Sequence, residues 1–166
     1  MFFQDNLIAT YPCIVLKGIV MFPDRIHHYD TDDKTILNAV YSALKSDEKI
    51  VLVRQKDIMK DSKDLTNVCR VGCVSKILQV IDLGDNRSRI VVKGINRANI
   101  NSLEEYNNQL KADVEVVDVI DYDIDPYYEK SLIGYARKMA SSYISLNTKM
   151  HKDIKKAVND IDDCGF

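Results

Sequence analysis

The strongest structural signal in this chain is the stretch VGCVSKILQVIDLGDNRSRIVVKGINRANI, residues 71–100. Between residues 68 and 82 apolar side chains fall on both faces of an extended chain, which is typical of a curved sheet around a core. The turn sequence Leu83-Gly-Asp-Asn86 predicts a hairpin that returns the chain beside this strand. We interpret Gly72 as a bulge inside the first strand and Gly94 as a bend in the second.

Shorter elements are predicted on both sides of this hairpin. The expected strands cover residues 11–17, 49–54, 95–102 and a segment from residue 112 onward. One helix is predicted between the first two strands, because Thr31-Asp32-Asp33 supplies an N-cap and acidic first-turn residues. Ile36, Val40 and Leu44 recur every four residues and give this helix, which reaches about Ser46, an apolar face. Several strands and tight turns around one helix predict an α+β fold with a small, partly closed β-barrel.

The character of the chain changes near Asp121. Asp125 and Pro126 are a good N-cap and first residue for a helix of about 20 residues. Its apolar residues recur every three or four positions: Tyr128, Leu132, Tyr135, Met139, Tyr143 and Leu146. A second helix is predicted from about Lys149 to Asn159. We therefore expect a barrel domain over residues 1–120 and, over residues 121–166, the start of a helical bundle that is truncated.

Composition limits the class of protein. Hydrophobic residues make up 46% and charged residues 29% of the 166 residues, as in globular proteins that fold in water. No apolar run approaches the roughly 20 residues of a membrane span, and the first residues do not resemble a secretory signal. We therefore expect a cytoplasmic protein. The 23 basic and 25 acidic residues give a net charge of −2, which argues against a dedicated nucleic-acid binder.

The residues that commonly bind metals do not form a convincing site. Cys13, Cys69, Cys73 and Cys164 are expected to be free, mostly buried thiols. Along one strand Cys69 and Cys73 would lie roughly 13 Å apart, too far for one zinc ion. His27 and His28 would point to opposite faces of a strand. The run Asp121-x-Asp123-x-Asp125 lacks the glycine and the glutamate of a calcium loop, so no metal is expected.

Catalytic and nucleotide-binding motifs are missing from the sequence. It contains neither G-x-x-x-x-G-K-[ST] nor G-x-G-x-x-G, and its six glycines are scattered singly. Ser141, Ser142 and Ser145 lie on a predicted helix without a base partner. We therefore predict a non-catalytic chain with no cofactor of its own. The lysines at positions 149, 152, 155 and 156 form a basic stripe that is either a solvated helix face or a contact for an acidic partner or nucleic acid.

Three stretches of the barrel segment resemble the LON substrate-binding domain family, found at the N-terminus of Lon-type ATP-dependent proteases. YPCIVLKGIVMFP, residues 11–23, is similar to the family's opening strand and its Phe-Pro pair. Residues 71–100 match the pattern V-G-x-x-x-x-I-x-x, the hairpin, and G-x-x-R-A-x-I. Residues 50–56 resemble the strand before the family's variable loop. The tail IDDCGF, residues 161–166, is similar to an interhelical loop that follows the barrel in full-length proteases.

This resemblance implies a PUA-like β-barrel followed by a helical bundle, within a hexameric, cytoplasmic serine protease. It implies that this region recognises unfolded or damaged proteins and supports hexamer assembly, while ATP and Mg²⁺ belong to an ATPase module that lies outside this sequence. A stand-alone LON or PUA-like module that binds protein or RNA is the alternative. The segment His27-His-Tyr-Asp30 is more polar than the family's second strand, which argues against an apolar contact surface there.

Unfolded proteins are recognised through exposed apolar side chains, so the receptor needs an adaptable apolar surface. We expect Met21, Phe22 and Pro23 at the first turn to belong to this substrate-binding surface. Ile58 and Met59, an apolar pair in the polar loop of residues 56–67, are expected to complete it. The alternative for Met21 and Phe22 is that they close the end of the barrel.

Overall fold

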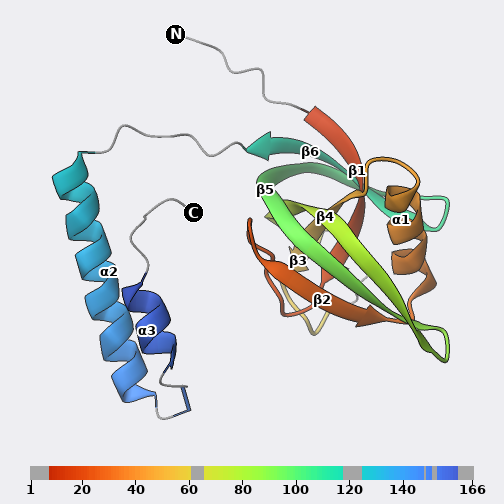
Figure 1. The fold of residues 1–166 in the computed structure, drawn as a ribbon. Helices are drawn as coiled ribbons and strands as arrows, with labels where there is room; N and C mark the ends of the chain where they lie inside the picture. Colours follow the sequence, from red (N-terminus) through yellow and green to blue (C-terminus); the bar gives the residue numbers. More distant parts are fainter. Residues whose placement is uncertain (1–7, 61–65, 118–124, 148, 151–152, 161–166) are drawn as a thin grey trace, which may run out of the picture. The chain divides into compact units, whose positions relative to one another are not determined.

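The structure is a computed structural model that describes residues 8–60, 66–117, 125–147, 149–150 and 153–160. The chain divides into two compact units, residues 1–118 and residues 119–166 (Figure 1). The described strands are β1 (Ile8–Leu16), β2 (Ile26–Thr31), β3 (Lys49–Gln55), β4 (Val68–Gly84), β5 (Arg87–Tyr106) and β6 (Gln109–Val117). The helices are α1 (Lys34–Leu44) in the first unit, and α2 (Pro126–Leu146) and α3 (Asp153–Asn159) in the second.

The six strands form one mixed sheet that closes almost into a ring. Their order is β2-β5-β4-β3-β1-β6, and β5 also pairs with β6. Only β1 and β3 are parallel to each other; the other described pairs are antiparallel. Five strands therefore make the ring, and β2 lies outside it on the free side of β5. This confirms the predicted α+β fold with a partly closed barrel and one packed helix.

The long strand β5 makes the ring possible. Its first part, Arg87 to Lys93, lies between β2 and β4, and its last part, from Arg97 onward, pairs with β6. A bend was predicted at Gly94. β5 does not end there, but its register with β4 shifts beside Gly94, where Ser75 lies opposite Gly94 and Val74 opposite Asn96. Gly94 also allows a close approach: a Cβ atom there would lie 2.1 Å from the carbonyl oxygen of Phe22.

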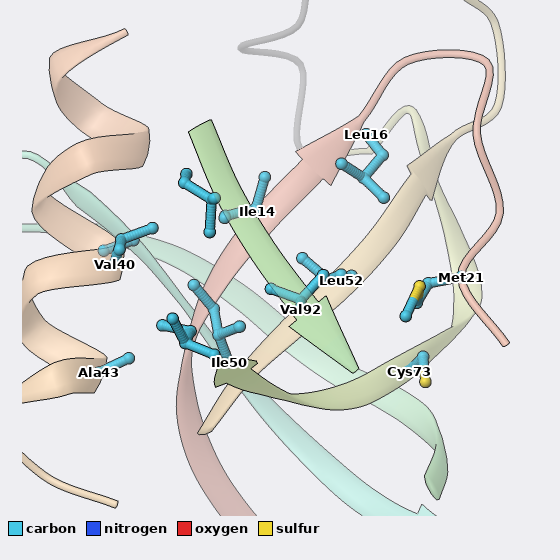
Figure 2. Close-up of a cluster of buried hydrophobic side chains, with 12 residues drawn as sticks. Ile14, Leu16, Met21, Val40, Ala43, Ile50, Leu52, Cys73 and Val92 are labelled. Carbon is cyan, nitrogen blue, oxygen red and sulfur yellow. The ribbon is translucent and has the colours of Figure 1, made fainter. Parts of the chain in front are cut away.

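The sheet is buried on both faces around residues 73–77 of β4, as the two-sided apolar pattern predicted, but further along this strand Leu78, Ile81 and Leu83 are exposed. The helix-side core contains residues of α1 packed against four strands: Ile14, Leu16, Met21, Ala39, Val40, Ala43, Ile50, Leu52, Cys73, Ile77, Ile90 and Val92 (Figure 2). The ring core takes residues from all five ring strands: Cys13, Val51, Val53, Val74, Ala98, Ala112 and Val114. Since successive side chains of a strand point to opposite faces, β1 and β3 contribute to both cores.

Short local signals set the turns and the helix start. Asp33 caps α1, and its Oδ1 accepts a hydrogen bond of 2.8 Å from the N–H of Thr35. Asp85 and Asn86 have positive φ angles of 53° and 60°, which suits the tight β4–β5 hairpin. A second hairpin of the same kind, at Asn107-Asn108, was not predicted. Asparagine tolerates the left-handed conformation better than most residues, so this pair was a usable signal.

The glycine at position 72 has a different role from the one predicted. The register between β3 and β4 does shift beside it, between Val53 and Gln55. Gly72 itself stays in register, opposite Val53 on one side and Ala98 on the other. A Cβ atom at Gly72 would lie 2.9 Å from the Leu52 carbonyl oxygen, so close packing between strands requires glycine here.

The second unit consists of α2 and α3. The side chain of Asp125 accepts a hydrogen bond from the N–H of Tyr127 (2.8 Å) and Pro126 opens α2, as predicted. The predicted start of the next helix at Lys149 is wrong, because Met150 N–H bonds back to the Asn147 carbonyl (3.1 Å) in a turn. The apolar stripe predicted for α2 is exposed along its whole length: Tyr128, Leu132, Tyr135, Met139, Tyr143 and Leu146. Within the described residues, no helix is long and apolar enough to cross a membrane.

Candidate functional site

Two loops leave the sheet at the same end of its strands. Strands β1 and β3 are parallel neighbours, with Leu16 opposite Arg54, so their carboxyl ends lie side by side. The segment after β1, residues 17–25, and the segment after β3, residues 56–60, therefore begin at one end of the ring. These are the two segments in which the sequence predicted an apolar contact surface.

Phe22 projects from a turn that is fastened to β5. The N–H of Asp24 donates to the Gly94 carbonyl (3.0 Å), and the Gly94 N–H donates to the Arg25 carbonyl (2.9 Å). The side chain of Phe22 is 49% exposed, while that of Pro23 is half-buried. The backbone of this turn is held in place, and the aromatic ring has room to contact a partner.

Met21 does not offer an exposed side chain. It is only 8% exposed and belongs to the helix-side core, where Figure 2 shows it beside Cys73. The expectation of an accessible Met21 is therefore wrong, and closure of the barrel end is its structural role. The reason is a tertiary one: the turn folds back over the end of the sheet to reach Gly94 and carries Met21 inward.

The apolar pair Ile58-Met59 lies on a loop with an ordered base. Asn67 is buried, and its side chain donates to the Asp57 carbonyl (2.8 Å) and accepts from the Asp57 N–H (3.0 Å). Asp57 in turn accepts from the Met59 N–H (3.0 Å). With its base fixed, the loop leaves Ile58 55% and Met59 89% exposed.

We define the apolar rim as Phe22, Pro23, Ile58 and Met59. The structure adds two exposed residues that were not predicted: Val20, two residues before Phe22, and Ile26, four residues after it. Their apolar character was visible in the sequence. What could not be read there was the outward direction of their side chains, since it depends on how the turn docks onto β5.

An open polar pocket of about 300 Å³ lies elsewhere on the ring, and it was not predicted. Its lining comes from β1, β5 and β6: Thr10, Ser102, Glu104, Tyr106, Lys111 and Asp113. Asp113 accepts hydrogen bonds from the hydroxyls of Thr10 (2.5 Å) and Ser102 (2.8 Å). These bonds, that from Thr10 above all, hold the pKa of the Asp113 carboxyl below its ordinary value of 3.8.

This lowered pKa predicts a pH dependence of stability. A carboxyl group with a depressed folded-state pKa stabilises the fold above its unfolded pKa, and loses that effect as pH falls through the folded value. Asp113→Asn should therefore lower the urea midpoint at pH 6, with the difference from wild type shrinking as pH falls below 3.8. The double variant Thr10→Val/Ser102→Ala keeps the Asp113 carboxyl but removes both hydroxyl donors. Its loss of stability relative to wild type should also shrink as pH falls. A difference that stays constant from pH 6 to pH 2 would contradict this account.

Among the residues that the structure describes, the thiols and histidines do not build a reactive or metal-binding centre. Burial raises the pKa of the Cys13 thiol to about 12, so it stays neutral, and Cys73 is also buried without a disulfide. In the described part of the chain, no three His, Cys, Asp or Glu side chains gather where they could hold a metal. Cys164, Asp121 and Asp123 lie outside the described residues.

Comparison with known proteins identifies the family. Residues 10–165 match the family model described as the ATP-dependent protease La (LON) substrate-binding domain. The chain is 29% identical over 146 residues to a Lon protease of Buchnera aphidicola subsp. Schizaphis graminum, and 28% identical over 152 residues to that of Escherichia coli K12. These matches cover 86% and 92% of this chain but only 18% and 19% of the relatives.

Solved structures agree on the fold. The N-terminal domain of the Mycobacterium avium complex Lon protease matches with a TM-score of 0.67 and 20% identity, over 93% of this chain and 77% of that one. A Lon N-terminal domain protein from Xanthomonas campestris matches with a TM-score of 0.58 and 13% identity, over 80% and 73% of the two chains. With a family model that matches nearly the whole chain, this protein belongs to the LON substrate-binding domain family.

Proposed function

We propose that this chain recognises unfolded or damaged proteins for a Lon-type ATP-dependent protease and takes no part in the chemistry. The observation that carries the proposal is the apolar rim. Two loops at one end of the ring expose large apolar side chains to water there. Folded proteins hide such groups in their cores, and unfolded chains expose them. The family's description as a substrate-binding domain supports the same role.

The rim combines a fixed base with adaptable tips. The hydrogen bonds at Gly94 and Asn67 hold both loops, so little backbone order is lost when a partner binds. Met59 is unbranched and nearly fully exposed, which lets it adjust to partners of different shape. Fully burying one such side chain is worth about 1.5–3 kcal/mol, so a few contacts give weak, unspecific capture.

The exposed stripe on α2 supports a second part of the proposal, a role in hexamer assembly. None of the described residues of α2 is buried, although six large apolar side chains follow one face. Covering this face with further helices or another subunit would remove it from water. In the assembled protease, ATP and Mg²⁺ would act in the ATPase module, and the complex would work in the cytoplasm.

An NMR titration tests recognition directly. The labelled chain is titrated with a permanently unfolded, apolar-rich protein, and shift changes are expected to cluster at Phe22, Ile58 and Met59. Phe22→Ser combined with Met59→Ser should weaken binding at least tenfold, since about 1.4 kcal/mol of lost contact gives that factor. Leu78→Ser is the matched control, because Leu78 is as exposed as Phe22 but lies on β4, away from these loops.

Three outcomes are informative. Loss of affinity in the double variant with an unchanged control supports the rim. Binding that survives the double variant would keep recognition and discard these residues. No shift at millimolar ligand would refute recognition by this chain alone.

A further inference from the structure

We propose that an extended segment of the protein substrate pairs with the outer edge of β2 and adds a strand to the sheet. This inference rests on the proposed function and specifies how the substrate is held. Strand β2 is the end of the strand order, paired with β5 on one side only. No described strand covers its other side. Every strand of the ring itself has neighbours on both sides for at least part of its length.

The register shows which backbone groups face the open edge. In an antiparallel pair, hydrogen-bonded residue pairs alternate with non-bonded ones. The Gly94 N–H donates to the Arg25 carbonyl, so the bonded pairs continue at His27 and Tyr29, opposite Val92 and Ile90. The N–H and C=O groups of Ile26, His28 and Asp30 therefore point away from β5. The side chains of these three residues are also exposed.

A second open edge exists, but it is a poorer template. The distal half of β4, beyond Ile77, pairs only with β5. Its register with β5 shifts twice, between Ile77 and Gln79 and again between Asp82 and Gly84. Bulges of this kind twist an edge and interrupt the regular spacing of donors and acceptors. The pairing of β2 with β5 is unbroken from Ile26 to Thr31, so its outer edge presents the regular spacing that a new strand requires.

β2 lacks the usual protection of an edge strand. Its sequence, IHHYDT, contains no proline and no lysine, the residues that most often block pairing. The charge of Asp30 is matched by Arg89, whose Nε and Nη2 lie 2.6 and 2.7 Å from the two carboxylate oxygens. The edge is therefore open and close to neutral.

The edge also continues into the apolar rim. Ile26, the first residue of β2, is 64% exposed and follows Phe22 by four residues, directly after the turn. A substrate strand on β2 would align its alternate side chains with Ile26, and its end would extend toward Phe22. Main-chain bonds give affinity that does not depend on sequence, and the apolar contacts select for apolar segments. Only an extended polypeptide offers both.

Amide hydrogen exchange, read residue by residue by NMR, tests this mode of binding. The probe is a reduced and carboxymethylated protein that stays unfolded. We expect the amides of Ile26, His28 and Asp30 to exchange fast in the free chain and at least tenfold more slowly with the probe bound. The amides of His27 and Tyr29, already bonded to β5, serve as the internal control and should not change by this factor.

A variant pair tests the same point through affinity. His28→Pro removes one outward N–H without removing a bond to β5, and proline is tolerated at such edge positions. His28→Ala keeps the N–H and is the matched control. We expect the proline variant to bind the probe at least fivefold more weakly than the alanine variant. Equal affinities, with both variants folded, would overturn strand addition.

The outcomes separate the two proposals. Probe binding without slower exchange at Ile26, His28 and Asp30 overturns strand addition and leaves the proposed function standing. No probe binding at any concentration refutes both. If these amides already exchange slowly without the probe, and exchange more slowly as the protein concentration is raised, the edge pairs with a second copy of this chain. That result would also overturn the inference.

Discussion

Replacing Gly94 by alanine is expected to destabilise the barrel unit by about 3 kcal/mol, at the upper end of the usual cost of overpacking. The added methyl carbon would lie 2.1 Å from the Phe22 carbonyl oxygen and 2.9 Å from its carbonyl carbon. Both are backbone atoms, which cannot rotate away. The turn of residues 22–25 would have to lift, breaking the hydrogen bonds of Asp24 and Arg25 with Gly94.

Urea unfolding followed through the NMR signals of β5 measures this effect. Gly134→Ala is the matched control, because a Cβ atom at Gly134 would meet nothing within 4 Å apart from its chain neighbours and the backbone of its own helix. That variant should be as stable as the wild type or slightly more stable, since alanine favours a helix. Because the same turn carries Phe22, the Gly94 variant should also bind an unfolded protein less tightly under conditions where it remains folded. A Gly94→Ala protein within 0.5 kcal/mol of wild type would contradict the close approach.

The local parts of the fold could be predicted from sequence because their causes are local. Asp33 and Asp125 cap helices through bonds to residues two positions ahead, and Gly84-Asp85-Asn86 makes its own turn. The two-sided apolar pattern of β4 correctly indicated burial on both faces around residues 73–77, but not for Leu78, Ile81 and Leu83, which are exposed. Such features depend on a few neighbouring residues, and neighbours are what a sequence shows.

The candidate site could be predicted only in part, because its geometry depends on distant contacts. The sequence placed Phe22, Ile58 and Met59 in loops, where exposure is common. It could not show that β1 and β3 are parallel neighbours, which brings these loops to the same end of the ring. Nor could it show that the first turn docks on Gly94 and thereby buries Met21. The open edge of β2 was equally hidden, since it follows from the order of all six strands.

The second large effect concerns Ile50, on the strand that lies between the two cores. Ile50 is fully buried in the helix-side core, while its neighbour Val51 is fully buried in the ring core. Ile50→Ala should cost about 2–5 kcal/mol, through lost apolar contact and a cavity that closely packed neighbours cannot fill. Ile50→Val should cost about 0.5–1.5 kcal/mol, so the graded pair distinguishes a cavity from a general defect. Urea unfolding gives both values, and a cost below 1 kcal/mol for alanine would show that the core collapses around the gap.

Ile58→Ala completes the comparison, because it removes the same atoms from a side chain that is 55% exposed. Stability should change by less than about 0.5 kcal/mol, as for most surface substitutions. Ile58→Ala is instead expected to weaken the binding of unfolded protein, because Ile58 belongs to the apolar rim. Ile50→Ala should do the reverse: it weakens the fold but leaves the affinity of the folded fraction nearly unchanged. If both isoleucines affected stability alone, the rim would be a structural feature of this barrel and the proposed recognition surface would lie elsewhere.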